Sequence, residues 1–325
     1  MNPARGKKTA YRPARVTVGL ISYIPHLDGY FQNRLDILQL SLASVLANTE
    51  LPFDLMVFDN GSCKEVVEYL KEIQDSGKID YLILSDCNIG KIGAFKILFR
   101  AAPGEIVAYS DDDIFFYPGW IEAHIDILET YPRVGMVSGV PVRDASHRSR
   151  DSLLKWIEEG EPGLQVDSEY SIPDKWEKDW AESVGRDPVV HMQKIQDNKD
   201  LILTFKGVDA FGSASHFQFV TLKDVIVKAL PEIWGGNLMG EMMELDQAID
   251  ELGYLRLSTV ERYTQHIGNV LTPSMVDEAN EVGLHFERKT QEKRKRKHWL
   301  LHIPGGGKIL SRIYNYLFRI LNNID

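Results

Sequence analysis

Cysteine is scarce in this sequence, long apolar runs are absent, and acidic residues outnumber basic ones. The 325 residues include only Cys63 and Cys87, too few for a disulfide framework and consistent with a reducing compartment. No run approaches the roughly 20 apolar residues that span a bilayer, and no apolar stretch follows the basic N-terminus, so neither a membrane span nor a secretory signal is expected. The net charge of −10 argues against nucleic acid as a partner. The sequence therefore predicts a cytoplasmic protein.

The first half of the chain alternates short apolar runs with segments of helical spacing. Strands are expected at residues 16–22, 53–59, 80–86 and 105–110, and helices at 33–48, 64–76 and 91–102. Such alternation, with strands that are apolar almost throughout, is typical of a mostly parallel sheet covered by helices on both faces. Ligands of these sheets bind beyond the carboxyl ends of the strands. Asp59, Asp86 and the triplet Asp111, Asp112 and Asp113 lie at such ends, so a binding site is expected there.

The chain is expected to divide into five segments. They are a flexible basic leader (1–15), one half of an α/β domain (16–143), an inserted lobe (144–205), the second half (206–285) and a basic amphipathic tail (286–325). The lobe carries several tryptophans, which would either stack on a sugar ring or a lipid or fill a small core. From position 285 onward the chain has ten Lys or Arg against three acidic residues, a charge opposite to that of the rest.

The stretch AYSDDDIFFYPGW (108–120) places three carboxylates between a strand and an apolar run. Adjacent carboxylates repel one another, and burying one without a partner is costly. A divalent cation that bridges them to a diphosphate would offset this repulsion. The alternative is a solvated turn or a helix cap, which needs no ligand.

Together with FDNGS (58–62) and NIGKIG (88–93), this triplet resembles the motifs of family 2 glycosyltransferases of the GT-A fold. The resemblance covers residues 16–143 well and 207–269 more loosely. It implies an α/β, Rossmann-like, mostly parallel sheet and an enzyme that moves a sugar from a nucleoside-diphosphate sugar to an acceptor hydroxyl, generally with inversion. It also implies a divalent metal, Mn²⁺ or Mg²⁺, and a sugar, glycan or lipid-linked acceptor.

The resemblance assigns roles to the motif residues. Asp59 would contact the nucleobase, and a second set would hold the nucleotide: Asn88, Gly90, Lys91, Gly93, Asp111 and Asp112. Asp113 would hold the metal with Asp111 and with His266, whose nitrogen would make a mixed site that favours Mn²⁺. For Lys91 a solvated helix position, and for His266 a buried hydrogen-bonded histidine, remain alternatives.

The general base is the point at which this sequence departs from the family. The family has a Glu-Asp pair at the start of a late helix, and GEMMELDQAIDELGY (240–254) places Glu241 and Met242 there. Methionine cannot accept a proton, so Asp246, one helical turn further on the same face, is the first candidate base, followed by Glu244 and Glu241. This departure leaves a retaining mechanism open.

Two further residues are candidate acceptor contacts. His216 lies in GSASHFQFVTLKDV (212–225), which resembles the family's acceptor segment, and Trp120 ends the FYPGW loop after the acidic triplet. A structural role for His216 is the alternative.

The tail from 289 to 324 has the pattern of a basic amphipathic helix, which suits an anionic membrane surface or packing on a protein. Peripheral contact with the inner face of a membrane would fit a lipid-linked acceptor. Two other functions remain open. One is a nucleotidyltransferase, although the loop YIPHLDGYF after the first strand is not glycine-rich and basic as in those enzymes. The other is a non-catalytic relative that binds nucleotide or sugar, which Met242 keeps open.

Overall fold

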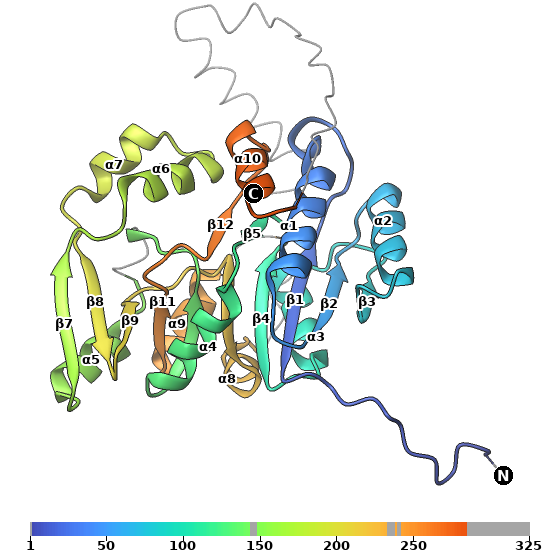
Figure 1. Ribbon diagram of the computed structural model, residues 1–325, viewed down its shortest axis with the longest axis horizontal. Coiled ribbons are helices and arrows are strands. Elements are labelled where there is room, and N and C mark those ends of the chain that lie inside the picture. The colour runs from blue at the N-terminus through green and yellow to red at the C-terminus, as the bar shows by residue number, and fades with distance from the viewer. Residues whose placement is uncertain (1, 144–147, 233–237, 239–241, 285–325) are drawn as a thin grey trace, which may run out of the picture. The chain divides into compact units, whose positions relative to one another are not determined.

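The computed structural model describes residues 2–143, 148–232, 238 and 242–284 (Figure 1). Glu241 and the tail from 285 onward therefore lie outside the described residues. The first half alternates strands and helices: β1 (Val16–Ser22), η1 (Gly29–Phe31), α1 (Arg34–Asn48), β2 (Phe53–Asp59), α2 (Lys64–Asp75), β3 (Tyr81–Leu84), α3 (Lys91–Ala101) and β4 (Ile106–Asp111). The helices and strands expected in this region are confirmed, with ends that differ by one or two residues.

The second half is more varied. Its elements are β5 (Ile114–Phe116), α4 (Trp120–Thr130), β6 (Val134–Ser138), α5 (Asp151–Glu159), β7 (Leu164–Glu169), α6 (Asp174–Ser183), α7 (Pro188–Ile195), β8 (Asp200–Phe205), β9 (Val208–Phe211), β10 (Gln218–Leu222), α8 (Lys223–Ala229), α9 (Met242–Glu251), β11 (Leu255–Ser258), β12 (Thr264–His266) and α10 (Pro273–Glu281). Strands β5 and β12 form a separate two-stranded sheet.

One ten-stranded sheet, ordered β3-β2-β1-β4-β10-β6-β11-β9-β8-β7, organises the fold (Figure 1). Strands β3, β2, β1, β4, β6, β11 and β8 point in one direction, and β10, β9 and β7 point in the other. The α/β class with a mostly parallel sheet is therefore confirmed.

Side chains alternate between the two faces of the sheet, as the period of a strand requires. Val18, Leu20 and Ile106 lie in a cluster with residues of α1, α2 and α4, whereas Ile21 and Tyr109 lie in a cluster with α3, α8 and α9. Both faces are thus covered by helices, which explains why the central strands are apolar almost throughout.

The region expected to be an inserted lobe continues the same sheet. Strands β7 and β8 pair antiparallel and reach the central strands through β9 and β11. Two of its tryptophans, Trp156 and Trp180, are buried, so they serve the core rather than an exposed stacking surface. The region also contains a buried ion pair, in which Arg143 Nε is 2.9 Å from Asp200 Oδ1.

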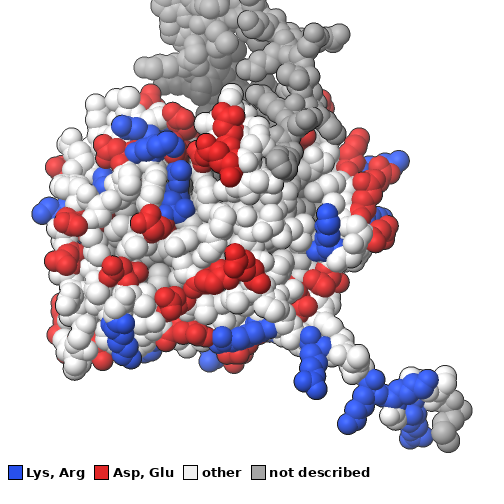
Figure 2. Space-filling view, viewed as in Figure 1, with Lys and Arg blue, Asp and Glu red and all other residues white. Residues whose placement is uncertain are grey.

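Charges of both signs are interspersed on the face of the body shown in Figure 2, while Lys and Arg gather on the N-terminal leader. Among the described residues, no helix has the length and apolar character that crossing a membrane requires.

Candidate active site

Four strands bring their ends to one edge of the sheet. In the parallel pairs, Ser22 at the end of β1 lies opposite Asp59 of β2, and Ile21 lies opposite Asp111 of β4. Strand β10 runs antiparallel to β4, so it begins at the edge where β4 ends. The residues that follow β1, β2 and β4 therefore meet those that precede β10, as predicted for parallel strands.

Asp59 lies at this edge with one oxygen engaged and one unpaired. Its Oδ2 accepts a hydrogen bond from the backbone N–H of Ser62 at 3.1 Å. Its Oδ1 is buried and has no hydrogen-bond partner among the described residues. Burial raises the pKa of this carboxyl, although its bonds to Ser62 and Gly61 lower it in part. An unpaired buried acceptor is costly, so Oδ1 is suited to a donor group on a ligand.

The turn after β2 is joined to the loop before α3 through two asparagines. Asn60 Nδ2 donates to Asn88 Oδ1 at 3.0 Å, and Asn60 Oδ1 accepts from the N–H of Ile89 at 2.9 Å. Asn88 Oδ1 also accepts from the N–H of Gly90 at 2.8 Å. Gly90 has a φ of +76°, which glycine adopts without strain, and α3 begins at the next residue. Asn88, Gly90, Lys91 and, within α3, Gly93 are thus placed beside the Asp59 turn.

The acidic triplet is balanced by two cations of the protein. Lys91 Nζ lies 2.7 Å from Asp111 Oδ1, and the hydroxyl of Tyr109 donates to the same carboxylate. The guanidinium of Arg34 bridges the other two: it donates to Asp112 Oδ1, and its Nη1 lies 2.6 Å from Asp113 Oδ2. These pairs compensate the repulsion for which the sequence analysis proposed a metal.

The local charges separate the behaviour of the two buried carboxyls. Burial and the neighbouring charge of Asp113 raise the pKa of Asp112 to about 6, although the charge of Arg34 opposes the rise. Burial would also raise the pKa of Asp113, but His266 and Arg34 together outweigh it and hold the pKa well below its usual range. At neutral pH Asp113 is therefore more fully deprotonated than Asp112 and is the better partner for a cation.

A metal would find two protein ligands at this edge. His266 Nε2 lies 3.3 Å from Asp113 Oδ2, and His266 Nδ1 is hydrogen-bonded to Ser183 Oγ at 2.8 Å, which orients the ring. No group of three or more His, Cys, Asp or Glu in the described part of the chain is arranged around one point. Asp111, the third predicted ligand, faces Lys91 and Tyr109 instead. Of the three predicted metal ligands, the structure therefore brings Asp113 and His266 together, with Arg34 on the same carboxylate.

The predicted bases lie in different environments. Glu244 is exposed on α9, and Met242 is buried in the core. Asp246 is buried between an imidazole and a guanidinium: His216 Nδ1 is 2.9 Å from Oδ2, and Arg256 Nη2 is 3.0 Å from Oδ1.

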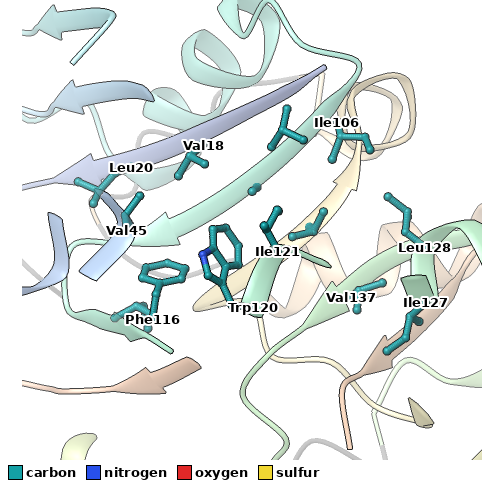
Figure 3. Close-up of a cluster of buried hydrophobic side chains, with 14 of the residues drawn as sticks. Val18, Leu20, Val45, Ile106, Phe116, Trp120, Ile121, Ile127, Leu128 and Val137 are labelled. Carbon is teal, nitrogen blue, oxygen red and sulfur yellow. The ribbon is translucent and has the colours of Figure 1, made fainter. Parts of the chain in front are cut away.

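Trp120 is a core residue. Its side chain is fully buried beside Phe116 and Ile121 (Figure 3), and its Nε1 donates to Thr49 Oγ1 at 3.0 Å. The prediction that Trp120 contacts the acceptor is therefore wrong, because no part of its ring reaches the surface.

Four residues of this site were missed by the sequence analysis: Ser22, Arg34, Asn60 and Arg256. Ser22 donates to Asp112 Oδ2 at 2.7 Å, and its place at the end of the first strand was a signal for it. Asn60 stood inside the FDNGS motif. Arg34 and Arg256 had no local signal, because an ion pair between distant segments leaves no pattern in the sequence around either partner.

Comparison with known proteins agrees with the motifs. Residues 31–184 match the model of the family described as Glycosyl transferase family 2. A glucosyl-dolichyl phosphate glucuronosyltransferase of Haloferax volcanii is 32% identical over 119 residues, covering 35% of this chain and 36% of that protein. An uncharacterised glycosyltransferase of Nostoc sp. is 26% identical over 111 residues, 34% of each chain.

A mannosyltransferase of Pyrobaculum calidifontis, solved with GDP-mannose and Mn²⁺, is 25% identical with a TM-score of 0.33, covering 44% of this chain and 38% of that one. The matched part spans about a third of the length of both curated relatives. The resemblance found in the sequence is confirmed, because residues 31–184 of this chain match the model of glycosyl transferase family 2.

Proposed function

We propose that this protein is a metal-dependent glycosyltransferase, which moves a sugar from a nucleoside-diphosphate sugar to an acceptor hydroxyl with inversion. The observation that carries this proposal is the convergence of the Asp59 turn, the Asn88 loop and the acidic triplet at the edge of the sheet, within the region that matches the family. A glycan, glycolipid or cell-surface polysaccharide is the product class we propose.

The residues of the edge divide between the parts of the donor. The unpaired Oδ1 of Asp59 would accept a hydrogen bond from the nucleobase. Asn88, Gly90 and Gly93 would bring backbone close to the nucleotide at the start of α3, and Lys91 would meet its phosphates. Asp111 and Asp112 would face the ribose and diphosphate. The ion pair between Asp111 and Lys91 would rearrange when the nucleotide binds.

Asp113 and His266 would hold a divalent cation, with Mn²⁺ favoured by the mixed nitrogen and oxygen ligands. When bound, such an ion stabilises the negative charge that develops on the departing diphosphate. Arg34 lies against the same carboxylate, so its release from Asp113 would accompany binding of the cation. Its guanidinium would then be available to the phosphates.

A screen of nucleotides with two variants tests this function. UDP, GDP, dTDP and CMP and their sugars would be added with and without Mn²⁺, because a ligand that binds the folded state raises the melting temperature. We expect one diphosphate to stabilise the protein in a metal-dependent manner and Asp113→Asn to abolish that dependence. Asp126→Asn, an exposed aspartate of α4, is the matched control. Stabilisation without sugar transfer would favour the non-catalytic relative, and no stabilisation by any ligand would refute the proposal.

We also propose that residues 289–324 contact an anionic membrane surface at the inner face, where a lipid-linked acceptor would be met. The support is the basic amphipathic pattern of that segment, which lies outside the described residues. Sedimentation with vesicles that contain anionic lipid, for the full chain and for a chain ending at 286, measures this contact. Equal sedimentation of the two would refute it.

A further inference from the structure

We propose that His216 is the general base of the transfer and that Asp246 positions it, an inference that rests on the proposed glycosyl transfer. The family places a carboxylate at the position of Met242, and none of the carboxylates described on α9 replaces it well. Glu244 is exposed on the helix. Asp246 Oδ2 is engaged by His216, and Oδ1 is buried 3.0 Å from Arg256 Nη2, so neither oxygen is open to an acceptor hydroxyl.

The contact with Asp246 prepares the imidazole for this role. Its Nδ1 lies 2.9 Å from Asp246 Oδ2, a carboxylate that accepts the Nδ1 proton and leaves Nε2 unprotonated in the neutral ring. The side chain of His216 is 22% exposed, and Nε2 has no hydrogen-bond partner among the described residues. The ring thus presents a proton acceptor at the surface.

His216 is linked to the acidic triplet and to His266 through its neighbour Phe217. It directly precedes Phe217, whose carbonyl accepts the N–H of Asp111 at 2.9 Å. The Phe217 ring lies between two imidazoles, 5.0 Å from His216 and 4.9 Å from His266 by ring centroids. Since His266 contacts Asp113, one row of three rings leads from the proposed metal ligands to His216.

Arg256 fixes both partners of the pair. It is buried on β11, lies 3.0 Å from Asp246 Oδ1 and donates from Nη2 to the carbonyl of Ala214 at 2.7 Å. The same guanidinium therefore holds the carboxylate and the backbone two residues before His216. This arrangement limits movement of the ring, as a positioned base requires.

The proton and electron balance is simple. His216 Nε2 takes the proton of the acceptor hydroxyl as its oxygen bonds to the anomeric carbon. The bond from that carbon to the diphosphate oxygen breaks, and its electron pair leaves with the diphosphate. Asp246 stabilises the imidazolium, which then returns the proton to solvent.

The test combines turnover with binding. Donor cleavage with water as acceptor would be measured as nucleoside diphosphate released from UDP-glucose, UDP-N-acetylglucosamine, GDP-mannose and dTDP-glucose with Mn²⁺. For His216→Gln we expect kcat to fall by about 10²- to 10⁴-fold, the usual contribution of a general base, with diphosphate affinity unchanged. His191→Gln is the matched control, because His191 on α7 also contacts a carboxylate, that of Glu177 on α6 at 2.9 Å. It should keep its kcat.

Asp246 acts through His216, so its test is the pH profile. In Asp246→Asn the imidazolium loses its counter-charge, and the acidic limb of the kcat profile should move to lower pH. The nearest other charged groups are reached only through the neighbours of His216: Arg256 through Asp246, and Asp111 and His266 through Phe217; all three are unchanged in this variant. An unmoved limb would refute the positioning role.

A measurement without turnover keeps the two proposals separate. Nitrogen-15 NMR of histidine-labelled protein at pH 8, assigned with His216→Gln, reports which ring nitrogen carries the proton. We expect Nδ1–H for His216, and the Nε2–H form would overturn the inference. Full activity of His216→Gln, or loss of activity in Glu241→Gln alone, would also overturn it while leaving the transferase intact. Failure of the wild type to bind any nucleotide would instead refute the proposed function.

Discussion

The ion pairs of Arg34 with Asp112 and Asp113 allow the loss of stability in an Arg34 variant to be predicted. In Arg34→Met, the carboxylates of Asp112 and Asp113 lose a cation while their side chains remain 6% and 11% exposed. Breaking a buried ion pair typically costs roughly 3–5 kcal/mol. The cost here should lie near the lower end, about 3 kcal/mol, because Asp112 already has a pKa raised to about 6 and can take up a proton at small cost. For a protein of 325 residues, the melting temperature should then fall by about 4 °C.

The same variant should respond more strongly to metal. Without the guanidinium, Asp113 and His266 are open to Mn²⁺, and a cation at 100 times its dissociation constant adds about 2.7 kcal/mol. Arg143→Met is the matched control, because it breaks a buried pair with Asp200, which is not among the residues of the proposed site. Differential scanning calorimetry with and without Mn²⁺ measures both effects. The reasoning is refuted if Arg34→Met melts like the wild type, or if Mn²⁺ stabilises the two variants equally.

Three further perturbations test other parts of the fold. In Gly61→Ala the new Cβ would lie 2.7 Å from the carbonyl carbon of Cys87, at a residue with a φ of +88°. The unfolding free energy should fall by about 1–3 kcal/mol, and nucleotide titrations should show weaker binding. Gly77→Ala is the control: Gly77 has a φ of +76° and open space around it, so this variant should lose stability without losing nucleotide affinity. Burial lowers the pKa of His124 to about 4, so below about pH 6.5 the unfolded chain binds a proton that the folded chain does not bind. The unfolding free energy should therefore fall by up to about 3 kcal/mol between pH 6.5 and 4. Denaturant unfolding of His124→Leu at a series of pH values should show a weaker dependence on pH. Trp156→Ala should cost about 3–5 kcal/mol and leave a single unfolding transition, since β8 and β9 belong to the main sheet; a separate early transition of residues 148–205 would contradict that view.

The sequence predicted the first half of the fold well because its signals are local. The apolar run at 53–59 and the helical spacing at 33–48 each contain the information for their own element. The same locality limits what the sequence indicates for residues 144–205. Nothing within the strands β7 and β8 states which edge they will join, and the structure adds both to the main sheet. Which tryptophans are buried depends on that pairing as well.

Whether a candidate residue lies at the site or in the core depends on the direction of its side chain. Motif positions such as Asp59 and Asn88 were placed together by the register of neighbouring strands, which the sequence analysis anticipated. Trp120 was misassigned because its position in a loop motif says nothing about the side to which its ring turns. The first turn of α4 directs it into the cluster with Phe116 (Figure 3).

The acidic triplet shows why the sign of a local charge is not sufficient to infer a ligand. Three adjacent carboxylates require positive charge close by, because they repel one another. The compensating charges, however, come from Arg34 at the start of α1 and Lys91 at the start of α3, far away in the sequence. Because both cations sit at helix starts beside the strand ends, the triplet remains charged without any ligand. A divalent cation would therefore enter by exchange with a guanidinium, and its affinity would depend on Arg34 as much as on the ligands that the motif supplies.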